Sequence, residues 1–238
     1  MTEQMIARLR RSPRRLLEKD GVPGPGPGSL SLVLARAGVG KTAFLVGIGL
    51  DALLAGQRVL HVTLDRTIDK VRDWYDDLLL ELLRLEPEAP HPAELQLAVE
   101  RRRHIHTFLG DTFSVARLRT AAGVLASHMD FRPDVLVVDR LELEHVDPAE
   151  IADLKTLAGE LGAELWMSCR THRDGPAPRP GHLPPPADRV EDLVDLAFCL
   201  EPEGDTVRLE VIEDRGELLA RQTRIVLDPH RLLLRPGA

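Results

Sequence analysis

Apolar and polar positions repeat with two different periods along this chain, and the two periods alternate. Short runs rich in valine and leucine predict buried strands. These strands cover residues 30–34, 58–65, 104–108, 134–139 and 164–169. Longer segments with apolar residues three or four positions apart predict helices. These helices cover residues 42–55, 67–85, 93–103, 114–129 and 149–161. Because strands alternate with helices, the sequence predicts an α/β fold with a mostly parallel central sheet.

The last part of the chain has a different pattern, with strand-like runs and no helix between them. These runs cover residues 196–200, 207–212 and 218–227, with a turn predicted at 214–216. A terminal apolar run at 231–234 is a candidate edge strand. Strands joined by short turns pair antiparallel. The sequence therefore predicts a C-terminal antiparallel extension on one side of the parallel sheet.

Several polar residues mark where the predicted helices begin and end. Ser114 is a good N-cap for helix 114–129, and Asp147 followed by proline begins helix 149–161. Gly162 is the expected C-terminal end of the latter helix. The helix at 67–85 is strongly amphipathic. Its buried stripe is predicted at Val71, Trp74, Leu78, Leu82 and Leu85.

Three regions are predicted along the chain: a basic N-terminal segment (1–20), a linker (21–28) and one large domain (29–238). The segment carries six basic residues and an apolar stripe. The basic residues are Arg8, Arg10, Arg11, Arg14, Arg15 and Lys19, and the stripe is Ile6, Leu9, Leu16 and Leu17. A docked or frayed helix is expected here, and an arm for a partner is the alternative. The linker alternates glycine and proline, which excludes regular structure.

Composition narrows the classes of function. The 238 residues suffice for one α/β domain with a full core, and the net charge of −7 argues against broad electrostatic capture of nucleic acid. Both cysteines, Cys169 and Cys199, lie in apolar runs, which predicts buried free thiols of a reducing cytoplasm. No apolar run approaches the roughly 20 residues of a membrane span. The loop 170–188, rich in proline and arginine, is long enough to carry function.

The segment between the first strand and the first helix of the large domain has the spacing of a phosphate-binding P-loop. It reads Ala35 to Thr42, with alanine where the first glycine usually stands. Gly38 and Gly40 allow backbone N–H groups to face phosphate oxygens, and Lys41 adds a positive charge. The Thr42 hydroxyl is a hard oxygen ligand for Mg²⁺. The candidate nucleotide-binding residues are Ala35, Arg36, Ala37, Gly38, Val39, Gly40, Lys41, Thr42 and Ala43.

A second carboxylate-bearing strand fits the same chemistry. The run 135–139 is apolar and ends on Asp139. In P-loop nucleotide sites an acid at the end of such a strand helps to hold the metal ion. We therefore expect Asp139 to hold Mg²⁺ through a water molecule, opposite Thr42.

Taken together, these motifs resemble the RecA-type ATPase core, and most closely its branch of DnaB-type helicases and KaiC-type ATPases. The resemblance covers about residues 28–228. It rests on the P-loop segment 32–44, the strand 62–65 ending on an acid, the Asp139 strand, the run 165–168 and the C-terminal segments 191–196 and 211–216. It implies a RecA-like P-loop NTPase fold, binding of Mg·ATP, and a homo-oligomer with nucleotide sites between subunits.

The resemblance also assigns roles to single residues. Asp65 falls where the family has the glutamate that activates water, although helix N-cap is an alternative role. Ser168 and Cys169 fall on the γ-phosphate sensor strand, but cysteine lacks the amide of the usual glutamine. Arg215 falls at the arginine finger that reaches a neighbouring subunit, and a plain hairpin turn is the alternative. The usual companion lysine is replaced by Glu213.

Three hypotheses for function follow. The first is an ATPase that hydrolyses ATP slowly, with Lys41, Asp65 and Arg215 as catalytic residues. The second is a nucleotide-gated module that holds a protein partner through the regions 86–92 and 170–188. The third, which is less favoured, is a DNA-handling factor. Its candidate phosphate contacts are the N-terminal arginines, Arg101, Arg102, Arg103, Arg170, His172, Arg173 and Arg179.

Overall fold

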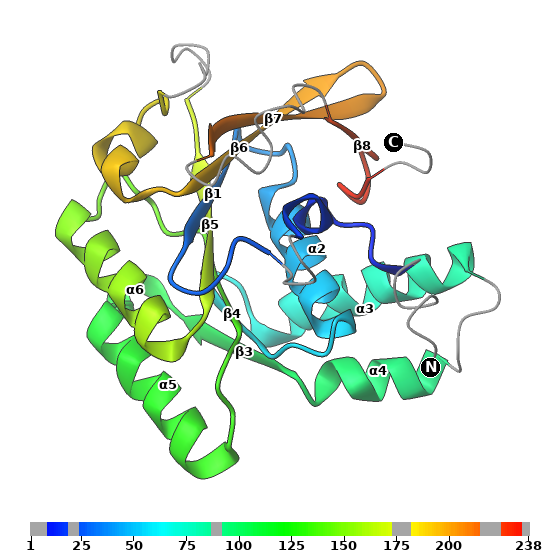
Figure 1. Cartoon of the computed structure of the whole chain (residues 1–238), viewed down its shortest axis with the longest axis horizontal. Coiled ribbons are helices and arrows are strands. Elements are labelled where there is room, and N and C mark those ends of the chain that lie inside the picture. The colour runs from blue at the N-terminus through cyan, green and yellow to red at the C-terminus, as the bar shows by residue number, and fades with distance from the viewer. Residues whose placement is uncertain (1–8, 19–23, 87–91, 173–181, 215–224, 235–238) are drawn as a thin grey trace.

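The computed structural model describes residues 9–18, 24–86, 92–172, 182–214 and 225–234. They form one eight-stranded sheet with helices on both faces (Figure 1). The strands are β1 Leu30–Ala35, β2 Val59–Leu64, β3 Arg103–Phe108, β4 Val135–Asp139, β5 Glu164–Arg170, β6 Leu196–Glu203, β7 Thr206–Asp214 and β8 Ile225–Leu227. The helices are α2 Lys41–Leu54, α3 Ile68–Leu85, α4 Pro92–Glu100, α5 Val115–Met129 and α6 Pro148–Leu161, with 3₁₀ turns η1 Pro13–Leu17, η2 Gly110–Thr112 and η3 Ala187–Leu193.

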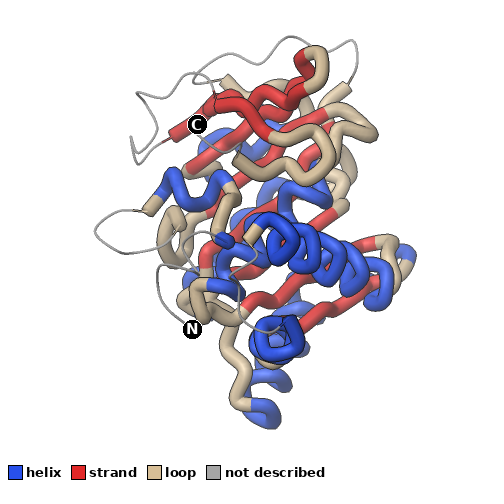
Figure 2. The backbone as a smooth tube through the Cα atoms, turned by 90° about the vertical axis from the view of Figure 1, so that its right-hand side faces the viewer, coloured by secondary structure: helices blue, strands red, loops and turns tan. Residues whose placement is uncertain are grey.

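The strand order is β3-β2-β4-β5-β1-β6-β7-β8. The first six of these strands run parallel, whereas β7 and β8 join antiparallel at the β6 edge. Figure 2 shows the strands as one continuous stack through the molecule. The predicted α/β architecture with a C-terminal antiparallel extension is confirmed. The predicted edge strand at 231–234 is wrong, since Leu234 makes only an isolated bridge to Leu227.

Each face of the sheet has its own apolar layer. On one face α2, α3 and α4 pack on β1, β2, β4 and β5 through alternate strand residues such as Val33, Val137 and Trp166. On the other, α5, α6 and η3 cover the intervening positions, including Leu136 and Leu165 (Figure 1). Both faces of the parallel strands are therefore buried, which explains why the sequence shows apolar runs there instead of alternation.

The capping residues visible in the sequence predicted three helix ends correctly. The Ser114 hydroxyl accepts a hydrogen bond from the N–H of Arg117, and the Asp147 carboxylate accepts one from Ala149. Gly162 ends α6 with φ 70°. The predicted stripe of α3 is partly wrong. Tyr75 is fully buried, whereas Trp74 is half-buried and Leu85 is exposed.

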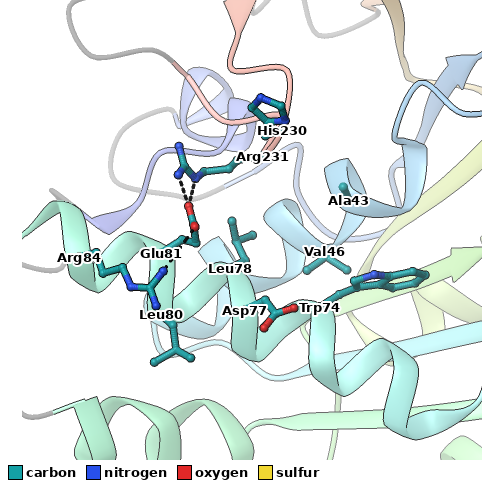
Figure 3. Close-up of a pocket in the computed structure, with 10 residues that line it drawn as sticks. All are labelled: Ala43, Val46, Trp74, Asp77, Leu78, Leu80, Glu81, Arg84, His230 and Arg231. Atoms are coloured by element: carbon teal, nitrogen blue, oxygen red, sulfur yellow. Dashed lines mark hydrogen bonds and ion pairs between the residues drawn. The ribbon is translucent and has the colours of Figure 1, made fainter.

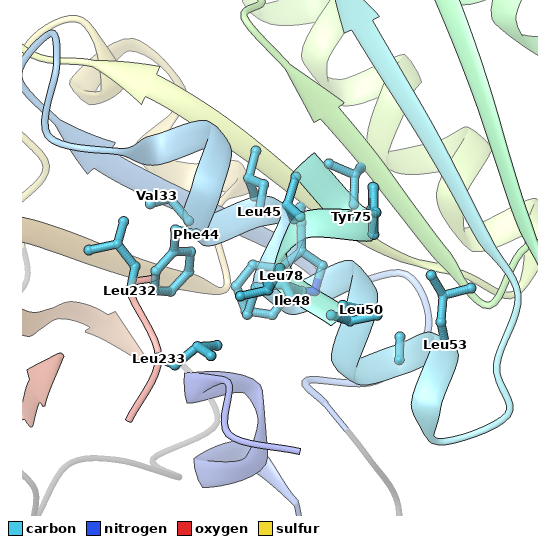
Figure 4. Packing of buried hydrophobic residues seen from close by; sticks show 14 of the residues in the cluster. Val33, Phe44, Leu45, Ile48, Leu50, Leu53, Tyr75, Leu78, Leu232 and Leu233 are labelled. Atoms are coloured by element: carbon cyan, nitrogen blue, oxygen red, sulfur yellow. The ribbon is translucent and has the colours of Figure 1, made fainter. Parts of the chain in front are cut away.

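The described ends of the chain pack together on α2. Leu9 and Leu17 of the N-terminal segment are buried in the same cluster as Leu232 and Leu233. Figure 4 shows the last two beside Phe44 of α2. The N–H of Leu234 donates to the carbonyl of Arg11 at 2.8 Å. The expectation of a docked N-terminal segment is confirmed for residues 9–18, and η1 is its 3₁₀ turn.

Candidate functional site

The loop 36–40 connects β1 to α2 at the carboxyl edge of the parallel strands. Gly38 and Gly40 have φ of 82° and 112°, a region that favours glycine. Gly40 is the N-cap of α2 and no side chain caps this helix. A Cβ on Gly40 would lie 2.7 Å from Cδ1 of Leu232, so a larger residue here would require the buried Leu232 side chain to shift. The first amides of α2 are left for another acceptor.

Lys41 begins α2 and reaches back over the loop. Its Nζ donates to the carbonyl oxygens of Ala35 at 2.7 Å and Arg36 at 3.0 Å. Burial lowers the pKa of Lys41; Cys169 and Asp139 oppose this shift, and the charges of Arg170 and Arg140 add to it. The ammonium group therefore lies inside the curve of the loop.

Thr42 and Asp139 are 97 residues apart in the sequence and meet directly. The Thr42 hydroxyl donates to Oδ2 of Asp139 at 2.7 Å, and the Ser168 hydroxyl donates to Oδ1 at 2.6 Å. β5, which carries Ser168, lies between β1 and β4. Asp139 is 1% exposed. Both of its carboxylate oxygens are thus fixed by hydroxyl donors in an almost fully buried position.

The same end of the sheet has a further oxygen on the α2 face. Thr63 is the register partner of Asp139, so the two side chains leave the sheet on the same side. The Thr63 hydroxyl is buried and has no hydrogen-bond partner among the described residues. The donors gathered here are hydroxyl and carboxylate oxygens, the ligand type that Mg²⁺ prefers. The chemistry of these residues therefore fits a magnesium ion, which Thr42 and Asp139 would hold.

Asp65 and Arg140 directly follow the neighbouring strands β2 and β4. Their side chains form an ion pair, with Arg140 Nη2 3.0 Å from Asp65 Oδ2. Both backbones have positive φ, 113° and 71°, which costs on the order of 1–3 kcal/mol for each non-glycine residue. The N–H of Arg140 donates to Ser168 Oγ at 2.9 Å. Asp65 is not a helix N-cap, because Thr67 performs that role for α3.

Of the two residues that the resemblance places on a sensor strand, Ser168 contacts Asp139 and Cys169 is buried beside it in sequence. Ser168 is occupied by Asp139 and by the backbone of Arg140. Burial raises the pKa of the Cys169 thiol to about 12, so the thiol stays protonated. Cys199 is also buried, and burial likewise raises its pKa to about 12. The prediction of buried free thiols is confirmed.

Arg215 lies outside the described residues, so its role as an arginine finger stays a prediction. Glu213 is in β7, where it pairs with Ala197 of β6. Part of the predicted loop 170–188 and most of the 86–92 region also lie outside the described ranges. Within the described part of that loop, residues 187 and 188 begin η3.

A groove of about 500 Å³ runs beside the first turns of α2. Ala43 and Val46 of α2 line one side, and α3 lines the other from Trp74 to Arg84 (Figure 3). His230 and Arg231 close one end, and Arg231 forms an ion pair with Glu81. Leu80 is 47% exposed at its margin. The groove combines apolar walls with charged rims.

The arginine clusters proposed for DNA phosphates are partly engaged within the fold. Arg103 is 4% exposed in its side chain, pairs with Asp76 and stacks on Tyr75. In the N-terminal segment Arg14 is fully buried, and Arg11 pairs with Glu86. These arginines are therefore not a free basic surface.

A scan of protein-family models found no match to this chain, and a search of curated proteins also found none. Among the described helices, none is both long and apolar enough to cross a membrane. The structure thus joins three of the candidate residues, Lys41, Thr42 and Asp139, at one edge, and places Asp65 just after β2, the strand that pairs with the Asp139 strand β4. It also adds Arg140, which the sequence analysis missed although a charge directly after Asp139 was a usable signal.

Proposed function

We propose that the chain is a RecA-like P-loop ATPase that binds Mg·ATP at the carboxyl edge of the parallel strands. The observation that carries the proposal is the 2.7 Å contact between Thr42 and Asp139, beside the Lys41 ammonium. A helix N-terminus, a lysine and two metal-ligand oxygens together match the needs of a triphosphate with its magnesium ion. Residues 35–43 would contact the phosphates, and Thr42 and Asp139 would hold the metal.

Magnesium at these oxygens would neutralise charge on the β- and γ-phosphates. In hydrolysis, the oxygen of a water molecule forms a bond to the γ-phosphorus while the bond from that phosphorus to the bridging oxygen breaks. The electron pair of the broken bond stays with ADP, and the other product is inorganic phosphate. Asp65 is the candidate acceptor for the proton of the water, at the end of a strand that pairs with β4. Hydrolysis is expected to be slow, because Cys169 replaces the usual amide sensor.

The test is calorimetric titration of Mg·ATP into the wild type and into Lys41→Ala. We expect one site per chain and a loss of affinity of at least ~30-fold in the variant, because a desolvated charge contact to phosphate is removed. Lys155→Ala is the matched control, since the Lys155 ammonium also makes two hydrogen bonds, but to Leu193 and Asp195 on the other face of the sheet. Absence of heat with the folded wild type would refute nucleotide binding.

A nucleotide-gated binding module is the second candidate function. The observation that favours it is the groove beside α2, because its Ala43 and Val46 directly follow the P-loop. Steady-state assays of the wild type, Lys41→Ala and Asp65→Asn separate the two candidates. Turnover in the wild type that falls in both variants supports the ATPase. Wild-type turnover no faster than that of Lys41→Ala, combined with ATP binding, supports the module.

A further inference from the structure

Backbone strain is concentrated where β2 and β4 end. Among the described residues, the non-glycine positions with positive φ are Asp65, Asp130, Arg140 and Leu232. Asp65 and Arg140 follow adjacent strands and their side chains face each other in one ion pair. A glycine at either position would remove the strain. The sequence instead keeps two charged side chains there, which indicates that the side chains have a task.

The stability of the fold does not account for this pair. The Arg140 side chain is 37% exposed and that of Asp65 is 68% exposed, so solvent screens their attraction. An ion pair of this exposure contributes too little to offset two strained backbones. The guanidinium of Arg140 is therefore held only weakly by Asp65, at the same edge of the sheet as the P-loop.

Arg140 is also fixed relative to the metal-binding carboxylate. Its N–H donates to Ser168 Oγ, and the same hydroxyl donates to Asp139. The positive charge of Arg140 acts on Lys41, together with that of Arg170, the last residue of β5 and the register partner of Ala35. A group that approaches Lys41 from solvent with two or more negative charges would compete with the single carboxylate of Asp65 for this guanidinium. A phosphate offers two acceptor oxygens to the planar donor pair of an arginine.

We propose that Arg140 binds the γ-phosphate of the ATP held by its own chain, and that the Asp65–Arg140 ion pair opens when it does so. This inference rests on the proposed function of the P-loop. Arg140 would then act on the nucleotide of its own chain, whereas Arg215 was expected to act on that of a neighbouring subunit. It also frees the Asp65 carboxylate for the attacking water only when a γ-phosphate is present.

The first experiment compares affinities for Mg·ADP and for Mg²⁺ with the β,γ-imido analogue of ATP. We expect Arg140→Gln to bind the analogue roughly 10-fold to 100-fold more weakly, since a hydrogen-bonded charge is lost, and to bind ADP as the wild type does. Asp65→Asn should bind the analogue more tightly, because Arg140 no longer has a competing carboxylate. Arg119→Gln is the matched control: this arginine of α5 is also 37% exposed, and it pairs with two carboxylates of α6.

Arg140→Gly separates this role from a structural one. Glycine relieves the positive φ, so the melting temperature should not fall and is expected to rise by ~2 °C. The preference for the ATP analogue over ADP should nevertheless be lost. A variant that melts lower and loses both nucleotides equally would overturn the inference, as would unchanged discrimination in Arg140→Gln.

Mixing of subunits tests the assignment in cis. Lys41→Ala chains keep Arg140, and Arg140→Gln chains keep the P-loop. If Arg140 acts on its own chain, a mixture has no more ATPase activity than the sum of its parts. Recovery of activity on mixing would overturn the assignment in cis. Failure of the wild type to bind either nucleotide would refute the proposed function itself. If the wild type binds both nucleotides and Arg140→Gln keeps the same preference for the ATP analogue over ADP, only this inference is refuted.

Discussion

Two arginine–carboxylate pairs lie at opposite edges of the parallel part of the sheet, one at the amino ends of its strands and one at the carboxyl ends. Arg14 and Glu164 meet at the amino end of β5, where Nε and Oε1 are 2.5 Å apart and the side chains are 0% and 4% exposed. Arg140 and Asp65 meet at the carboxyl ends of β4 and β2, 3.0 Å apart, with 37% and 68% exposure. The first pair is enclosed by further partners, including Asp51 and Gln57. The second is open to solvent.

The comparison shows that the same two chemical groups act differently according to burial. In a dry environment an unpaired charge is costly, so removal of one partner from a buried pair destabilises a protein strongly. In solvent the same removal costs little. Arg14 thus fastens the N-terminal segment to the sheet, whereas Arg140 can exchange its partner without a penalty to the fold. Four predictions follow in order of decreasing effect, and the first and the last of them test this contrast directly.

The largest effect is expected from Arg14→Met. This variant leaves Glu164 buried without its main cation, and the free energy of unfolding should fall by about 3–5 kcal/mol. Burial already raises the pKa of Glu164, and Arg14 is the main group that opposes this shift. The double variant Arg14→Met with Glu164→Leu should recover most of the loss. Urea unfolding at constant pH measures both, and equal stability of Arg14→Met and the wild type would contradict the assignment.

The free energy of unfolding should depend on pH by about 3 kcal/mol because of His61. It is fully buried on β2, its Nδ1 lies 3.0 Å from the Tyr75 hydroxyl, and burial lowers its pKa to about 4. In the unfolded chain His61 binds its proton near pH 6.5. Its contribution to the free energy of unfolding is therefore fully present above pH 6.5 and is lost as the pH falls from 6.5 to 4. Urea unfolding across this range measures the effect. In His61→Gln the fall in this window should be smaller; an unchanged pH profile would exclude His61 as its source.

Gly40→Ala should cost about 1–3 kcal/mol for the positive φ, and more for the contact with Leu232. Gly38→Ala is the control, because its φ is 82° but no atom lies within 4 Å of its Cβ position. Thermal unfolding of the two variants isolates the contact of the C-terminal segment with the P-loop. If Gly38→Ala is the less stable variant, Leu232 does not restrict the loop.

The smallest effect on stability is expected at the open pair. Arg140→Gln should change the free energy of unfolding by less than ~1 kcal/mol, because the ion pair is solvent-screened. Urea unfolding beside Arg14→Met gives the contrast directly. A loss comparable to that of Arg14→Met would mean that the exposed pair is a structural element and not an exchangeable one.

The sequence predicted what is local and periodic. Gly38, Gly40 and Asp139 were found because P-loop spacing and an acid at the end of an apolar run are visible in single segments. The Ser114 and Asp147 caps were found for the same reason. The Arg14–Glu164 contact was not predicted, because the two residues are 150 positions apart and neither has a distinctive neighbourhood.

The remaining differences arise from tertiary packing. Leu232 was assigned to an edge strand, whereas the segment 228–234 turns back onto α2 and reaches Gly40. Tyr75 replaces Trp74 in the core because its hydroxyl has a buried partner in His61. Arg140 was passed over because a pattern of residue types does not reveal a positive φ or an ion pair between two strand ends.

Amide hydrogen exchange with and without Mg·ATP tests the central claim most directly. The account predicts slower exchange in residues 36–43 and 139–141 when Mg·ATP is present, no change in residues 10–18 around Arg14, and no response at all in Lys41→Ala. Equal protection of both ends of the sheet, or unchanged exchange in 36–43 at millimolar Mg·ATP, would contradict the assignment of the nucleotide to the carboxyl edge.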